Sequence, residues 1–200
     1  MTLHLVSVIV LAAAFLYFSY HLLSTRLNGQ SVLFLFIGLM FLLPPLIYLF
    51  PENQSDTVGH FRLFAYSLEN TVVYVFIVVL FWGLTMLSEI GPVTIAVSFL
   101  FSMCLIWATW DPKWQPFQSI IRSFCILIAM MIATFALIRR QKNGLWMVLA
   151  LMTLAFALKP QVLSSAFGPF DTQNYLKALS LFFMATAISS RNLPLFGNRA

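Results

Sequence analysis

Charged side chains are scarce in this sequence of 200 residues. Only 8% of the residues are Asp, Glu, Lys or Arg, against about 25% in average soluble proteins, whereas 61% are apolar. A soluble 22.7 kDa protein could not cover its surface with 11 basic and 6 acidic side chains. The composition therefore excludes a soluble globular enzyme and a disordered chain, and it predicts a helical integral membrane protein.

Cysteine is scarce as well, and recognisable catalytic motifs are missing. Cys104 and Cys125 both lie within apolar runs, and no Cys or His spacing suits a metal ion. These features exclude a disulfide-rich scaffold. The sequence also lacks GxSxG, HExxH, paired carboxylates and a phosphate-binding loop. We therefore assign no catalytic residue, no metal site and no cofactor from the sequence.

Long apolar runs dominate what is present. A helix that crosses a bilayer needs about 20 mostly apolar residues. Seven segments come close to this length, and we predict a single transmembrane domain over residues 1–200 with no soluble domain. The segments are Leu3–Leu23, Ser31–Phe50, Asn70–Glu89, Pro92–Trp110, Phe117–Ile138, Leu145–Phe167 and Thr172–Ser190.

Ionisable residues are absent from the middle of these predicted spans. Proton pumps and charged ion filters place Asp, Glu, His or Lys there. Glu69 and Glu89 are instead expected at helix ends. This placement argues against a proton-driven pump and against a channel with a charged filter.

Proline makes two of the spans irregular. Pro44 and Pro45 are expected to kink the second span, and Pro160 interrupts the sixth after Lys159. The sixth segment therefore either continues past a kink or is re-entrant, which would leave six full spans.

A helical pattern precedes the third span. Apolar residues recur at one-face spacing over 61–68, where Phe61, Phe64, Ala65 and Leu68 stand. The pattern fits an amphipathic helix at the membrane surface and an outward extension of the third span equally well.

The loop charges predict the orientation. With seven spans, one side carries six basic residues and one acid, whereas the other carries five of each. The basic side is expected to be cytoplasmic, so the N-terminus lies outside and the C-terminus inside, in a bacterial inner membrane or its equivalent. The residues of the basic side are Arg26, Arg139, Arg140, Lys142, Arg191 and Arg199, with Glu89 as its acid.

Polar residues gather at the predicted outer ends of the spans. Five of them suggest a ligand-binding pocket at the outer leaflet for an amphiphile with an acidic head, because three cations would surround one carboxylate. The alternative is that the long side chains snorkel from helix ends to the interface. The five are Glu69, Asn70, Arg122, Lys159 and Lys177, of which Arg122 and Lys159 are expected to lie deepest.

Tryptophan marks the end of the fourth span. Trp107, Trp110, Asp111 and Trp114 fit an interfacial aromatic belt that ends at a helix stop. The eight-residue string 107–114 also resembles the tryptophan-rich, WDP-containing outer segment of the haem-handling cytochrome c assembly proteins. That resemblance implies external histidines as haem ligands, for which His4 and His60 stand on the predicted outer side. The glycine-containing half of the family pattern is missing from this chain.

These observations favour a non-catalytic multi-pass membrane protein, as a subunit of a membrane complex or a receptor-like module. Membrane lipids and other membrane subunits, or self-association, are the expected partners, and nucleic acid is not. A transporter or scramblase-like protein for a lipid or hydrophobic solute is the alternative. An intramembrane lipid enzyme and a haem-handling protein are further hypotheses.

Overall fold

The computed structural model describes residues 2–25, 28–48, 56–111, 113–114, 116–159 and 168–190, and all regular elements in these ranges are helices. Four helical stretches are long and apolar enough to cross a membrane: His4–Ser24, Gly29–Tyr48, Gly59–Thr85 and Pro116–Ile138. The elements are α1 (Thr2–Thr25), α2 (Gly29–Tyr48), α3 (Asp56–Leu68), the π-helical segment η1 (Glu69–Val73), α4 (Tyr74–Thr85), α5 (Pro92–Ala108), α6 (Pro116–Ile138), α7 (Lys142–Ala157) and α8 (Pro169–Ser189).

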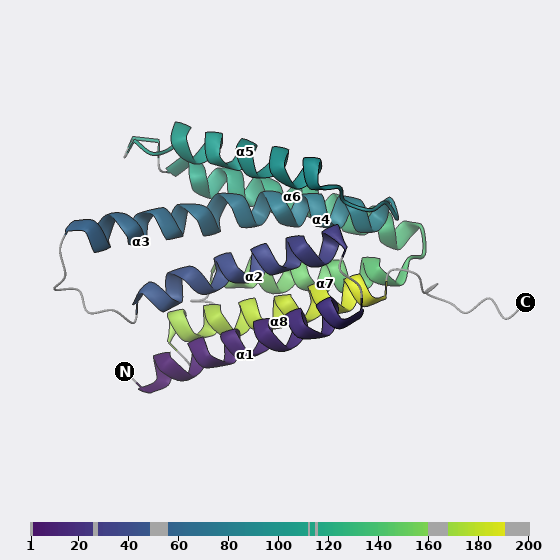
Figure 1. The fold of residues 1–200 in the computed structure, drawn as a ribbon, viewed down its shortest axis with the longest axis horizontal. Coiled ribbons are helices and arrows are strands. Elements are labelled where there is room, and N and C mark those ends of the chain that lie inside the picture. The colour runs from purple at the N-terminus through teal and green to yellow at the C-terminus, as the bar shows by residue number, and fades with distance from the viewer. Residues whose placement is uncertain are drawn as a thin grey trace, which may run out of the picture.

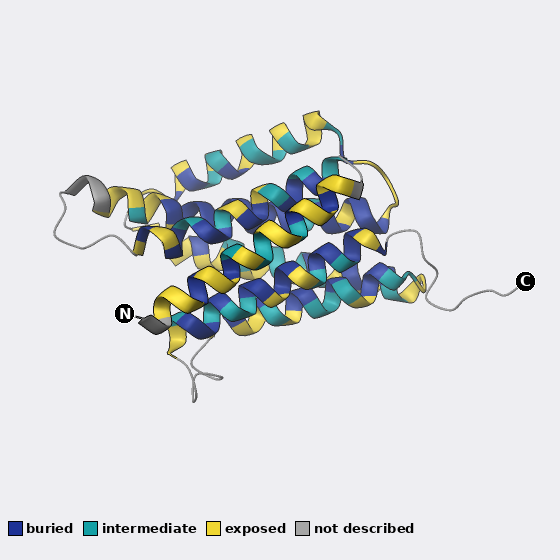
Figure 2. Cartoon of the chain, turned by 60° about the horizontal axis from the view of Figure 1, so that its bottom comes forward, coloured by how far each residue is buried: buried dark blue, intermediate teal, exposed yellow. Residues whose placement is uncertain are grey.

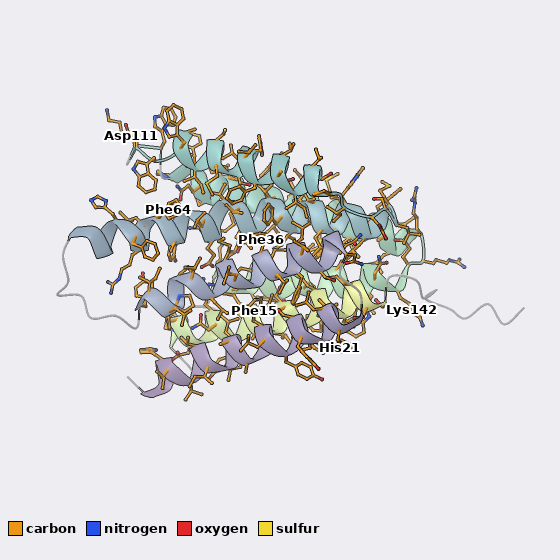
Figure 3. All side chains as sticks on the ribbon, in the orientation of Figure 1. Phe15, His21, Phe36, Phe64, Asp111 and Lys142 are labelled. Carbon is orange, nitrogen blue, oxygen red and sulfur yellow. The ribbon has the colours of Figure 1, made fainter. Side chains whose placement is uncertain are left out.

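The helices run back and forth along one long axis. Because α3, η1 and α4 follow one another without a break, the described residues form seven helical rods (Figure 1). We name the two ends of the bundle after residues labelled in Figure 3. The Asp111 end holds the starts of α1, α3, α6 and α8, and the Lys142 end holds the starts of α2, α5 and α7.

Six of the rods pack in a closed succession. Contacts join α1 to α2, α2 to α4, α4 to α6, α6 to α7, α7 to α8, and α8 back to α1. The core lies between them and contains large side chains with no exposed surface, such as Phe34, Phe41 and Leu151. In contrast, α5 lies at the edge, where only Ser102 and Ile106 are buried. Exposed residues line the outside of the bundle, in yellow in Figure 2, and many of them carry large apolar side chains, as expected for a surface that contacts lipid.

The third predicted span is shifted toward the C-terminus relative to the observed helix. The continuous rod starts at Asp56 rather than Asn70, and its last helical residue is Thr85 rather than Glu89, which lies exposed in the connection to α5. The amphipathic pattern over residues 61–68 is thus an extension of this rod and not a separate surface helix. Figure 1 shows α3 projecting beyond its neighbours. The polar residues inside the rod had masked its continuity in the sequence.

Of the three prolines that were expected to make spans irregular, two lie within the described residues. The helix α2 continues through the buried Pro44 and Pro45 to Tyr48, so the backbone bonds lost at these prolines belong to its last turns. Pro160 lies outside the described residues, as does the rest of the sixth predicted span up to Phe167. The kinks and the choice between six and seven spans therefore stay predictions.

Two amide side chains close the end of α4 near the Lys142 end, and a third bonds to the turn that follows it. The last carbonyls of a helix lack partners within the helix and need donors from elsewhere. Here these donors come from the start of α7, and the donor to the turn comes from α2. Gln141 Nε2 donates to Thr85 O (3.2 Å), Asn143 Nδ2 to Leu84 O (3.1 Å) and Gln30 Nε2 to Ser88 O (2.8 Å).

Two helices end in a left-handed residue that is not glycine. After α6, Arg140 has φ 56°, its amide donates to Leu137 O (2.8 Å), and the Gln141 amide donates to Ala136 O (3.0 Å). After α4, Leu87 has φ 53° in the same arrangement. Glycine is usual at this position because a Cβ atom is unfavourable there.

Arg140→Gly is expected to stabilise the fold by roughly 0.5–1 kcal/mol, since relief of the left-handed strain exceeds the added flexibility of the unfolded chain. Thermal unfolding in a mild detergent would measure the change. Arg139→Gly is the matched control, because Arg139 has no positive φ and lies over the Phe135 ring at 4.3 Å. Arg139→Gly removes the same charge and should destabilise the fold. Equal effects of the two substitutions on the unfolding temperature would contradict the explanation.

Candidate functional site

A buried ion pair lies inside the bundle. Lys177 Nζ on α8 is 2.6 Å from Glu69 Oε1 on η1, and their side chains are only 4% and 6% exposed. The Phe41 ring of α2 lies 5.6 Å from the same ammonium group. Removing two charges from water is costly, and only their close mutual contact offsets that cost.

The continuous rod of α3, η1 and α4 positions Glu69 beside α8. Consecutive residues of a helix point in different directions around its axis, so neighbouring side chains on η1 contact different helices. Glu69 contacts α8, whereas Asn70 Oδ1 accepts a hydrogen bond from Arg122 Nη1 on α6 at 2.9 Å. Single π-helical turns are frequent at functional sites. The segment η1 therefore joins a buried ion pair and a partly buried hydrogen bond on two different sides of one rod.

The five predicted pocket residues separate into three groups. Glu69 pairs with Lys177, Asn70 bonds to Arg122, and Lys159 lies exposed just beyond α7. Lys177, not Arg122 or Lys159, is the most buried of the three cations, because α8 packs between α1 and α7. The expectation that Glu69 lies at a helix end is also wrong, because Glu69 is inside the continuous helix Gly59–Thr85.

A second polar cluster links the first turns of α1 and α8. Asp171 Oδ1 accepts a hydrogen bond from Ser7 Oγ at 2.7 Å and lies 3.1 Å from His4 Nδ1. Asn174 Nδ2 donates to Ser7 Oγ at 3.1 Å. Asp171, Asn174 and Lys177 stand three residues apart, so α8 presents one polar stripe to its neighbours. This spacing was visible in the sequence, whereas the contribution of Ser7 was not.

An open cavity of about 560 Å³ lies at the Asp111 end. Its lining comes from α3, from the end of α5 and from the start of α6, near the Asp111 and Phe64 labels in Figure 3. The rim is aromatic and exposed, while three of the lining polar side chains are buried. The lining residues are His60, Leu63, Ser67, Trp107, Thr109, Trp110, Asp111 and Gln118.

The three buried polar residues of the cavity form a connected floor. Gln118 Nε2 lies 3.1 Å from Thr109 Oγ1 and 3.2 Å from Ser67 Oγ. One turn deeper on the same two rods, Arg122 bonds to Asn70, and Arg122 Nε has no hydrogen-bond partner among the described residues. Sequence patterns contained no signal for this floor, since isolated Ser, Thr and Gln residues are common in helices.

Only part of the tryptophan segment lines the cavity. Trp107, Trp110 and Asp111 line it together with His60, whereas Trp114 is exposed and packs near Phe117 with ring centroids 5.2 Å apart. His4, the other predicted external histidine, belongs to the cluster with Asp171. The aromatic belt and haem handling both stay predictions.

Comparison with protein-family models, with curated proteins and with solved structures finds no match to this chain. The function of the site therefore has to follow from its own geometry.

Lys177→Met is expected to destabilise the protein by about 3–5 kcal/mol, because it leaves the Glu69 carboxylate buried without a partner. Lys177→Met combined with Glu69→Met should recover most of this loss, since a well-packed apolar pair of similar size replaces both charges. Unfolding in detergent of the two single variants and the double variant would give the coupling energy. Additive losses would show that the two charges do not depend on one another.

Proposed function

We propose that this chain is a non-catalytic multi-pass membrane protein that binds an amphiphile at the Asp111 end. The cavity carries the proposal, because apolar and aromatic walls above a few fixed polar groups are typical of ligand sites. Its position at one end of the helices would place the head group at the membrane interface and leave the tail beside α3 and α5.

Basic residues at the opposite end support a position of the cavity on the outer face. Within the described residues, Arg139, Arg140 and Lys142 lie together at the opposite end, where basic residues favour the cytoplasm. We therefore propose seven spans with the N-terminus outside, in a bacterial inner membrane or its equivalent. The protein would act as a receptor-like module or as a subunit that presents the bound amphiphile to other membrane proteins.

The charge of the head group depends on the ionisable residues near the cavity. An acidic head was expected from the cations Arg122, Lys159 and Lys177. None of these lines the cavity, and Lys177 is already paired with Glu69. The spare donor Arg122 Nε beneath the floor is the observation that still supports an acidic head.

Leu63→Trp is expected to remove a bound amphiphile, because the larger side chain would occupy the cavity. Native mass spectrometry of protein extracted gently from its own membrane would detect the ligand and any partner chains together. Leu39→Trp is the matched control: Leu39 is 48% exposed, Leu63 is 51% exposed, and Leu39 is not among the lining residues. Retention by both variants, or loss from both, would argue against this cavity as the site.

A transporter for a lipid or hydrophobic solute is the second candidate, and the buried ion pair is the observation that favours it. Ionisable residues inside membrane bundles commonly mark substrate or ion pathways. The cluster of Asp171 and Asn174 extends along α8 from Lys177 toward the exposed His4, so polar groups reach from the bundle end to the pair.

If the protein moves lipids, vesicles that contain it should expose fluorescent inner-leaflet phospholipid to an external quencher faster than empty vesicles. The double variant Glu69→Met and Lys177→Met should slow this exchange while it keeps the fold. Identical rates with and without the protein would rule out lipid scrambling.

A further inference from the structure

The rim of the cavity combines two exposed indole rings. Trp107 in the last turn of α5 and Trp110, two residues beyond the end of this helix, both line the cavity, and they are 83% and 44% exposed. The Phe64 ring of α3 meets Trp110 nearly edge-on, with centroids 6.3 Å apart. Indole faces attract cations through the ring quadrupole, and groups of such rings recognise quaternary ammonium ions.

The charge at the cavity is negative, which suits a cationic ligand. Asp111 is the only charged residue among its lining residues apart from the titratable His60, and no Lys or Arg lines it. One carboxylate oxygen of Asp111 accepts the Lys113 amide at 2.9 Å, and the second oxygen has no hydrogen-bond donor among the described residues. The last carbonyls of α5 lie at the same end, and the negative end of a helix dipole favours cations.

The floor itself is uncharged, and the Arg122 cation lies one turn deeper on α6, where it bonds to Asn70. Ser67, Thr109 and Gln118 are neutral and already bond to one another. A quaternary ammonium group carries no N–H donor, so it needs no hydrogen-bond acceptor from this floor. Its methyl groups and spread charge suit contact with aromatic faces instead.

We infer that the cavity selects an amphiphile with a cationic quaternary ammonium head, such as the choline part of a zwitterionic lipid. The inference rests on the amphiphile site proposed above and specifies its head group. In this arrangement Trp107 and Trp110 contact the methylated nitrogen, Asp111 balances its charge, and the tail lies along Leu63 and the outer face of α3.

Three amphiphiles with the same ten-carbon tail would test the inference: decyltrimethylammonium, decanoate and decanol. Binding to the full chain in neutral maltoside micelles would be measured by equilibrium dialysis against protein-free micelles. Decyltrimethylammonium should bind about tenfold more tightly than the other two, which corresponds to the strength of a partly desolvated cation–π contact. Asp111→Asn and Trp110→Leu should each remove most of that preference.

Two control variants keep the comparison specific. Glu89→Gln removes an exposed acid near the Lys142 end, and Trp82→Leu removes a tryptophan of α4 that is 54% exposed. Neither lines the cavity, and neither should change binding. Decanol binding that persists in Asp111→Asn would show that the cavity of this variant remains intact.

The outcomes separate the two proposals. Equal saturable binding of all three amphiphiles, lost in Leu63→Trp, would keep the amphiphile site and overturn the ammonium preference. Tightest binding of decanoate, lost in Arg122→Ala, would overturn it in favour of an acidic head. No saturable binding of any of the three would overturn both proposals.

Discussion

The contact between Lys177 and Glu69 sets the strongest constraint on this structure. Two charges among apolar helices are tolerated only while they remain paired, so α8 and η1 must keep their register. That register fixes the neighbouring contacts. With Glu69 directed to α8, Asn70 meets Arg122 on α6, and the long rod is held between the two sides of the bundle.

The same rod connects the interior with the cavity. Ser67 lies on the cavity floor, and Asn70 and Glu69 follow in the next turn. A ligand that displaced the hydrogen bonds of Gln118 would therefore act within one turn of Arg122 on α6. This continuity connects the cavity at the Asp111 end with the buried pair, and η1 is the element that joins the two sites.

Parts of the candidate site were visible in the sequence, and other parts were not. The outer polar residues could be named because charged residues near apolar runs stand out against their surroundings. Their partners could not, since a pairing such as Lys177 with Glu69 joins residues 108 positions apart. The cavity was missed for a similar reason: each of Ser67, Thr109 and Gln118 is an ordinary helix residue by itself, and only packing brings them together.

Composition and local hydropathy were enough to predict a helical chain with long apolar spans and the approximate positions of its helices. Hydropathy is a local property, so apolar runs predict helices without knowledge of their neighbours. The packing of the helices was needed to show that residues 56–85 form one rod, that Lys177 is more buried than Arg122 and Lys159, and that α3, α5 and α6 line an open cavity. These properties depend on which helix faces meet, and the free energy of that packing is spread over many distant residues.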